Sequence, residues 1–133
     1  MKKISIKIPF GKRIFKVRNG NSTIYIPQRA DIIWLDFNPQ SGHEQKGKRP
    51  ALVLSSKEYN QKSGLCLCVP LTSKIKNYPF EVLCLVQNKT GAILSDQIKS
   101  IDFKARKATF IQKCDEEIFK QTKNNLALLL EIN

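Results

Sequence analysis

The sequence predicts a mainly β domain, a compact antiparallel barrel or strongly coiled sheet that ends in one amphipathic α-helix. Short apolar runs recur from residue 25 onwards, and turn residues such as Lys62-Ser-Gly64 and Lys76-Asn-Tyr-Pro79 separate them. The final segment changes to helical spacing of its apolar residues. The chain has 133 residues, 41% of them hydrophobic and 26% charged, which is typical of one globular domain.

The apolar runs give the predicted strands, at residues 32–37, 51–55, 65–71, 80–86, 92–94, 98–103 and 109–112. Many short strands joined by close turns are typical of a barrel or a coiled sheet. Residues 88–91 predict a hairpin turn with Gly91 in the left-handed region. Ser56 is the expected N-cap of a short helical turn over residues 56–61. Trp34 and Phe37 are expected to pack in the core.

Residues 115–130 predict the C-terminal helix. Asp115 is a candidate N-cap, and Glu116 and Glu117 suit the positive end of the helix dipole. Apolar or marginally apolar side chains recur at helical spacing, at positions 118, 119, 122, 126, 129 and 130. We therefore expect one face of this helix to pack on the barrel.

Residues 1–23 are a basic N-terminal extension. They hold seven Lys or Arg and no acid, whereas residues 24–133 hold sixteen Lys or Arg and eleven acids, so the extension carries +7 of the net charge of +12. Asn19-Gly20 between alternating runs predicts an added hairpin, but a loose arm or a leader outside the functional protein is the alternative. A basic chain favours nucleic acid or an acidic protein segment as partner.

The cysteines Cys66, Cys68, Cys84 and Cys114 do not have the spacing of a zinc site, and the single histidine is not near them. We expect buried, reduced thiols in a cytoplasm and no metal or other cofactor. No stretch approaches the roughly 18 apolar residues of a membrane span. The N-terminus also lacks the apolar segment of a secretory signal.

The loop at residues 38–50 joins two predicted strands and combines His43, Glu44, Lys48 and Arg49 with bounding prolines. Metal-free RNA cleavage needs a base for the 2′-hydroxyl proton, and a carboxylate such as Glu44 can serve. It also needs cationic donors at the phosphorus, and a guanidinium matches phosphate oxygens. A plain solvated loop with a surface ion pair is the alternative. His43 adjoins Glu44, so an extended backbone would point the two side chains apart, and His43 ranks below Glu44.

Ordered motifs carry a family resemblance. They are Tyr25-x-Pro27, DIIWLDFNP at 31–39, G-x-EQ-x-G-x-RP at 42–50, ALVLS at 51–55, YN at 59–60, CLCVP-x-T at 66–72, YPFEV at 78–82, Gly91, DQIKSI at 96–101 and Arg106. From residue 25 the chain resembles the MazF/PemK family of bacterial toxins, close to its MazF branch. Residues 1–23 lie outside the resemblance, so we expect the toxin-like domain at residues 24–133.

The resemblance implies an SH3-like barrel that forms a homodimer. It also implies a cytoplasmic, sequence-specific, metal-independent endoribonuclease of a toxin-antitoxin system. Such an enzyme cuts single-stranded RNA, with mRNA the expected target, to a 2′,3′-cyclic phosphate and a 5′-hydroxyl, and so inhibits translation and growth. The implied partner is an antitoxin whose flexible acidic tail occupies the basic RNA groove, which electrostatic complementarity would favour.

The same resemblance implies roles for individual residues. Glu44 falls on the acid–base glutamate, Arg49 on the catalytic arginine and Thr72 on a hydroxyl residue that holds the scissile phosphate. Lys48 replaces a histidine found in some relatives, so it should attract phosphate, and the general acid stays open between Lys48 and His43.

Four further residues match positions along the RNA groove. Lys99 and Arg106 are expected on phosphates and Gln97 on a base edge. Phe80 either stacks a base or packs in the core.

Two other functions are compatible with the implied fold. One is a gyrase poison, but that activity depends on a Trp-Gly-Ile-like end, and this chain ends Leu-Leu-Glu-Ile-Asn. The other is a nucleic-acid-binding barrel without catalysis. The intact 42–50 motif argues against the second function, because a pure binder has little use for a carboxylate in a phosphate groove.

Overall fold

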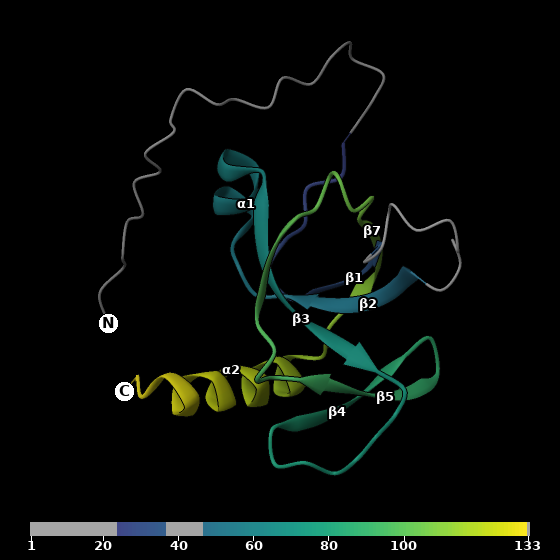
Figure 1. Cartoon of the computed structure of the whole chain (residues 1–133), viewed down its shortest axis with the longest axis vertical. Helices are drawn as coiled ribbons and strands as arrows, with labels where there is room; N and C mark the ends of the chain where they lie inside the picture. The colour runs from purple at the N-terminus through teal and green to yellow at the C-terminus, as the bar shows by residue number, and fades with distance from the viewer. Residues whose placement is uncertain (1–23, 37–46, 133) are drawn as a thin grey trace.

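The computed structural model describes residues 24–36 and 47–132, and it confirms a mainly β fold with a C-terminal helix (Figure 1). Residues 1–23, Phe37, His43 and Glu44 lie outside the described residues. The second strand of the predicted N-terminal hairpin, expected at residues 24–26, is not formed, because these residues have no strand structure. The elements are β1 (Asp31–Asp36), β2 (Lys48–Val53), α1 (Lys57–Ser63), β3 (Leu65–Thr72), β4 (Glu81–Val86), β5 (Lys89–Leu94), β6 (Lys99–Asp102), β7 (Thr109–Lys113) and α2 (Glu116–Leu130).

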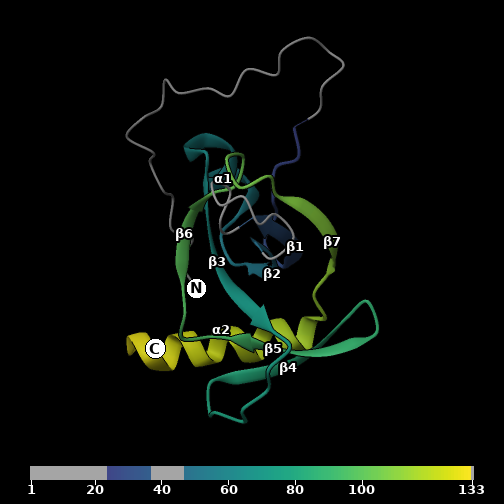
Figure 2. The same cartoon turned by 45° about the vertical axis from the view of Figure 1, so that its right-hand side comes forward.

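The eight-residue strand β3 organises the sheet. One edge of β3 pairs with β2, with Ala51 opposite Pro70, while the other edge pairs with β6 over Leu65–Cys68 and then with β5 at Leu71 and Thr72. The described strands form one antiparallel sheet in the order β4-β5-β3-β2-β1-β7, with β6 beside β3. Figure 2 shows that this sheet curls into a partly closed barrel, with α2 across one end.

The central part of the sheet, in β1 and the second halves of β2 and β3, is buried on both faces, which explains its continuous apolar runs. Strand β4 alternates instead, with Leu83 and Leu85 52% and 59% exposed. Neighbouring residues of the central strands enter different cores. Ile32, Leu52 and Val69 join a core that is covered by Ile118 and Phe119 of α2. Residues of opposite parity on the same strands join a second core with β6 and the segment after it, and these are Ile33, Leu35, Ala51, Val53, Cys66, Cys68, Ile101 and Phe103.

The two outer strands of the sheet, β4 and β7, approach each other without forming a ladder. The amide side chain of Gln112 on β7 bridges them instead. Its Oε1 accepts a hydrogen bond from the backbone N–H of Gln87 at 3.0 Å, and its Nε2 donates to the carbonyl of Leu85 at 3.0 Å. Between Ile32 and Ile33 the β1–β7 register skips Ile111, a bulge that increases the local bend of the sheet.

Both helices begin as their sequences predict. The Ser56 hydroxyl accepts from the backbone N–H of Tyr59 at the start of α1, which ends at Gly64 with φ 78°. Asp115 caps α2 by accepting from the N–H groups of Glu117 and Ile118. The last turns of α2 differ from the expected packing, because Leu129 and Leu130 remain 40% and 57% exposed.

Asn60 of α1 ties three segments together. It is fully buried, its Oδ1 accepts from the Ser55 hydroxyl at 2.6 Å, and its Nδ2 donates to the carbonyl of Pro27 at 2.8 Å. A buried amide with partners on both ends holds its neighbours in one arrangement, because each unmade bond would leave a desolvated polar atom. The incoming chain at Pro27 is therefore fixed against the end of β2.

The β4–β5 hairpin is confirmed, but the predicted role of Gly91 is wrong. The loop is the two-residue pair Gln87-Asn88, with φ of 51° and 67°, as right-handed strand twist favours. Gly91 lies inside β5, and its φ is not among the positive values in the described residues. A Cβ at Gly91 would lie 3.1 Å from the carbonyl oxygen of Thr72, so glycine is favoured there by close backbone approach.

A buried carboxylate anchors the segment before β1. Asp31 is 3% exposed, and its Oδ2 accepts from the Tyr25 hydroxyl and from the backbone N–H of Gln28. Its Oδ1 lies 2.6 Å from Nζ of Lys113 on β7. Burial and then the hydrogen bond to Asp31 raise the pKa of Tyr25 above its ordinary value.

Tyr25→Phe should therefore destabilise the protein in a pH-dependent way. At pH 7 the loss of a hydrogen bond to a charged group should cost about 1–2 kcal/mol. A raised folded-state pKa means that the contribution of Tyr25 is present below the unfolded value of about 10 and is lost as the pH rises beyond it. Urea unfolding of both proteins from pH 7 to 11 should show a difference that narrows above about pH 10.

Tyr78 provides the control, because its side chain is 59% exposed. Tyr78→Phe should leave the free energy of unfolding unchanged within about 0.5 kcal/mol. A pH-independent difference between wild type and Tyr25→Phe would contradict the assignment of the raised pKa to Tyr25.

Candidate RNA-binding site

One hollow brings the predicted catalytic arginine to a wall of β3. This hollow, which we call the Arg49 hollow, has a volume of about 560 Å³. It is lined by Trp34, Lys48, Arg49, Pro50, Leu71, Thr72, Ser73, Lys74, Val86, Gln87, Lys89, Thr90 and Gly91. Strand ends and the β4–β5 hairpin supply these residues, so a rigid scaffold positions the polar side chains.

Strand register explains why Arg49 and Thr72 share this hollow. Ala51 pairs with Pro70 in the antiparallel β2–β3 ladder, and continuing that register by two residues brings Arg49 opposite Thr72. On its other edge Arg49 pairs with Leu35 of β1, so its backbone is held on that side by a ladder. The oxygen of the Thr72 hydroxyl accepts from the N–H of Lys74 at 3.1 Å, which leaves the hydroxyl proton available for a ligand.

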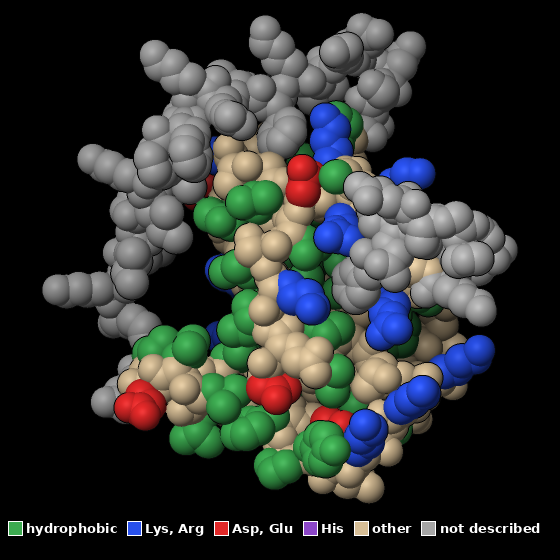
Figure 3. Space-filling view, in the orientation of Figure 1, with side chains coloured by type: hydrophobic (Ala, Val, Ile, Leu, Met, Phe, Trp, Pro, Cys, Tyr) green, Lys and Arg blue, Asp and Glu red, His purple; other side chains and the backbone are tan. Residues whose placement is uncertain are grey.

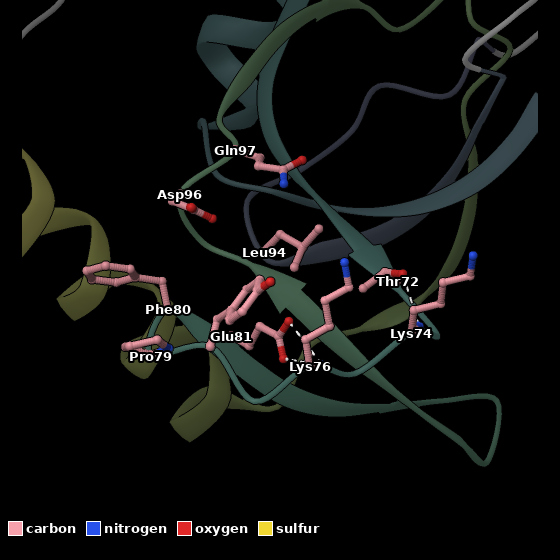
Figure 4. Close-up of a pocket in the computed structure, with 10 residues that line it drawn as sticks. Thr72, Lys74, Lys76, Pro79, Phe80, Glu81, Leu94, Asp96 and Gln97 are labelled. Atoms are coloured by element: carbon pink, nitrogen blue, oxygen red, sulfur yellow. Dashed lines mark hydrogen bonds between the residues drawn. The ribbon is translucent and has the colours of Figure 1, made fainter.

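A second hollow continues from the first. This Gln97 hollow, of about 390 Å³, is lined by Thr72, Lys74, Lys76, Tyr78, Pro79, Phe80, Glu81, Leu94, Asp96 and Gln97. Figure 4 shows Thr72 and Lys74 at one end of it and Phe80 at the other, on the side of α2. Because Thr72 and Lys74 line both hollows, the two form one continuous surface.

Glu81 fixes the loop that forms the floor of the Gln97 hollow. Its carboxylate accepts from the backbone N–H of Lys76 at 3.1 Å (Figure 4). It also accepts from the backbone N–H of Asn77 at 2.9 Å. Asn77 has a φ of 62°, a left-handed conformation that asparagine tolerates better than most residues. The carboxylate therefore orders the loop that carries the Lys76 and Tyr78 side chains.

The Arg49 hollow is cationic. In the part of the chain that the structure describes, its charged lining residues are Lys48, Arg49, Lys74 and Lys89, and no acidic side chain lines it. Figure 3 shows Lys and Arg side chains gathered on the lower right of one face, around the β4–β5 hairpin, and hydrophobic side chains around α2. Such a surface attracts an extended polyanion.

The structure gathers several predicted site residues but not all of them. Lys48, Arg49 and Thr72 line the Arg49 hollow, and Thr72, Phe80 and Gln97 line the Gln97 hollow. Lys99 and Arg106 line neither hollow. Nη1 of Arg106 donates to the carbonyl of Asp36 at 3.2 Å, so this side chain helps to hold the end of β1.

Sequence analysis missed other members of the site. Trp34 was expected in the core, but it is half-buried and lines the Arg49 hollow beside Pro50, its partner across the β1–β2 ladder. Lys74, two residues after Thr72, was also missed. Among residues 24–36 and 47–132 no group of three or more His, Cys, Asp or Glu could hold a metal ion, and no helix is long and apolar enough to cross a membrane.

The sequence pattern of the family described as "PemK-like, MazF-like toxin of type II toxin-antitoxin system" matches residues 28–130. The chain belongs to this family. The endoribonuclease toxin MazF of Escherichia coli K12 is 54% identical over 85 residues, which are 64% of this chain and 77% of the relative. The endoribonuclease toxin ChpB of the same strain is 33% identical over 110 residues, which are 78% of this chain and 94% of the relative.

Solved structures of the family have the same fold as this member. A crystal structure of MazE-MazF from Deinococcus radiodurans matches with a TM-score of 0.72 and 33% identity, over 83% of this chain and 100% of the matched chain. MazF of Deinococcus radiodurans matches with a TM-score of 0.71 and 38% identity, over 81% and 99%. The curled antiparallel sheet with its C-terminal helix is therefore the fold of this toxin family.

Glu81→Ala should loosen the loop in the Gln97 hollow without unfolding the protein. It removes the acceptor of two backbone N–H groups, and hydrogen bonds to charged groups contribute about 1.5–3 kcal/mol each. We expect amide hydrogen exchange at Lys76 and Asn77 to accelerate by about tenfold or more. Asp96→Asn, at an exposed residue of the same hollow, is the matched control. Unchanged exchange at both amides in Glu81→Ala would show that another contact orders the loop.

Proposed function

We propose that this chain is the toxin of a type II toxin-antitoxin system, a sequence-specific, metal-independent endoribonuclease that cleaves single-stranded RNA. Messenger RNA is the expected target, and its cleavage inhibits translation and growth in the bacterial cytoplasm. The observation that carries the proposal is the cationic hollow holding Arg49 and Thr72, in a family whose relatives are named endoribonucleases. Those names favour catalysis over a binding-only barrel or a gyrase poison.

The proposed reaction is an attack of the 2′-hydroxyl oxygen on the adjacent phosphorus. Glu44, assigned from the sequence motif, takes the hydroxyl proton, and the 5′-oxygen leaves with a proton from the general acid. This produces a 2′,3′-cyclic phosphate and a 5′-hydroxyl. Lys48 lines the Arg49 hollow, and His43 lies outside the described residues, so both stay candidates for the general acid.

Arg49 and Thr72 would stabilise the charge that develops on the phosphate oxygens. A guanidinium stays charged at any working pH and presents two donors in a plane. Thr72 adds a hydroxyl donor from the facing strand, because its oxygen is already held by Lys74. Donors that are fixed before the reaction need no reorganisation in the transition state, and removing one typically lowers the rate by about 10² to 10³.

The Gln97 hollow is the proposed site for bases next to the scissile phosphate. Gln97 offers both a donor and an acceptor to a base edge, and Phe80 offers an aromatic face. Lys48, Lys99 and Arg106 are assigned to phosphates, the last two outside the hollows. Single-stranded RNA suits this surface because its bases are free to leave the stack and enter a pocket.

The proposed partners are an antitoxin and a second copy of the chain. A flexible acidic tail on the antitoxin fits the cationic Arg49 hollow. For the homodimer, the end of α2 leaves Leu128, Leu130 and Ile132 exposed by 71%, 57% and 60%. Exposed apolar side chains grouped in this way mark an interaction surface.

Cleavage of a long single-stranded RNA in EDTA tests the enzyme. We expect sequence-restricted cuts with 5′-hydroxyl ends from the wild type, and a rate lower by about 10² to 10³ for Arg49→Ala. Glu44→Ala should also lose most activity. Lys120→Ala is the matched control, because it removes one exposed positive charge from α2, away from the hollow. If folded wild-type protein leaves the RNA intact, the ribonuclease proposal is wrong. RNA binding without cleavage and inhibition of gyrase are then the functions to test.

We also place the domain boundary at residue 24, with residues 1–23 dispensable for fold and cleavage. The family match covers residues 28–130, and every helix and strand of the described residues begins after residue 30. A chain that lacks residues 2–22 should keep the far-ultraviolet circular dichroism spectrum of the full chain and its cut sites. Loss of folded protein after the deletion would show that the extension contributes to the fold.

A further inference from the structure

Two cysteines from distant parts of the chain meet beside the start of α2. Cys84 lies on β4, and Cys114 lies between β7 and the N-cap Asp115. Both belong to the core that α2 covers, with 4% and 8% of their surfaces exposed, and their thiols lie close enough to shift each other's pKa. Sγ of Cys84 also donates to the carbonyl of Leu85 at 3.7 Å. The backbone N–H of Cys114 donates to the carbonyl of Ala30 at 2.8 Å, so its position is fixed by the strand region.

An open hollow leads from the surface to Cys84. It has a volume of about 540 Å³, and Cys84 lines it together with Leu83, Leu85, Gln112, Asp115 and Ile118. A small uncharged molecule such as hydrogen peroxide can therefore approach this residue. The other cysteine pair, Cys66 and Cys68, is 0% and 1% exposed and lies in the second core.

The interaction between the two thiols makes them unequal. The Cys114 side chain lowers the pKa of the Cys84 thiol, although burial and the Asp115 carboxylate oppose this effect. The same interaction, and then burial, raise the pKa of the Cys114 thiol. Cys84 lines the hollow and Cys114 does not, so peroxide approaches Cys84 first. The thiolate is the nucleophile in thiol oxidation, so the lowered pKa of Cys84 agrees with Cys84 as the attacking residue and Cys114 as the resolving one.

We propose that Cys84 and Cys114 form an oxidation site for hydroperoxides, in which the neighbouring thiols become a disulfide that links β4 to the start of α2. The Cys84 thiolate attacks one peroxide oxygen, the O–O bond breaks, and a sulfenic acid forms while hydroxide leaves and takes up a proton. The Cys114 sulfur then attacks the Cys84 sulfur and displaces water. Two thiols and one hydrogen peroxide give one disulfide and two waters, with the peroxide reduced by two electrons.

The disulfide would cross the seam that Gln112 already bridges between β4 and β7. It would close a loop that contains β5, β6 and β7, and closing such a loop stabilises the folded state. The β4–β5 hairpin also supplies Val86, Gln87 and Thr90 to the Arg49 hollow, so the link would hold one wall of that hollow. In a reducing compartment a bond of this kind is transient, which suits a reversible response to oxidant.

Peptide mapping of the full-length protein tests the proposal. Reduced protein is treated with hydrogen peroxide, its remaining thiols are blocked with N-ethylmaleimide in denaturant, and the protein is cut with trypsin. Cleavage after Lys89 and Lys113 places the two cysteines in separate peptides.

After peroxide treatment we expect a Cys84–Cys114 disulfide-linked peptide that dithiothreitol separates, and maleimide on Cys66 and Cys68. The Tm of the oxidised protein should be about 5 °C higher than that of the reduced protein. Maleimide on both Cys84 and Cys114 after peroxide, or links to other cysteines or between chains, would overturn the proposal.

Single variants test the order of attack. In Cys114→Ser the Cys84 sulfenic acid has no resolving thiol, so dimedone should label Cys84 in the folded protein. In Cys84→Ser the remaining Cys114 should react with dimedone at least tenfold more slowly.

Cys66→Ala, in the other cysteine pair, is the matched control and should still form the Cys84–Cys114 disulfide. Folding of each variant is checked by circular dichroism, and a folded Cys114→Ser that does not react with dimedone would refute peroxide access. None of these measurements uses RNA, so their outcome is independent of the ribonuclease assay.

Discussion

The fold depends on β3, because this strand must pair along both edges at once. One edge of β3 pairs with β2. Within its eight residues the other edge pairs first with β6 and then with β5. The second half of β3, Cys68–Leu71, is buried on both faces, and its alternating residues supply both cores. The same strand ends at Thr72, so the site is mounted on the most constrained element of the chain.

Most strands could be predicted from the sequence because each carries apolar side chains, in continuous runs where both faces are buried, as in β1, and in alternation where one face is exposed, as in β4. The boundaries of β3, β6, β7 and α2 came within one residue of the predicted ranges. The starts of β2 and β5 were missed by three residues, because Lys48, Arg49, Lys89 and Thr90 pair through their backbones while their side chains stay exposed. Cross-strand pairing of polar residues leaves no hydrophobic pattern, so it becomes visible only once the partners are known.

Some residues of the candidate site could be predicted from the sequence and others could not. Arg49 and Thr72 were predicted from motifs, and their shared hollow follows from the β2–β3 register. The sequence predicts Trp34 in the core because large aromatic residues are usually buried, yet Trp34 and its partner Pro50 are both only half-buried. Gly91 was predicted to form a turn, but it lies inside β5, where its lack of a side chain allows close backbone packing. Its neighbour is the Thr72 carbonyl on β3, a contact that separation along the chain conceals.

The bridge made by Gln112 sets the circumference of the barrel. A strand ladder would hold β4 and β7 at the usual spacing of about 4.8 Å, whereas one side chain holds them apart by its own length. Both ends of the amide are used, one on the N–H of Gln87 and one on the carbonyl of Leu85. Asparagine is one methylene shorter and a glutamate carboxylate cannot donate, so only glutamine can make both hydrogen bonds across this seam.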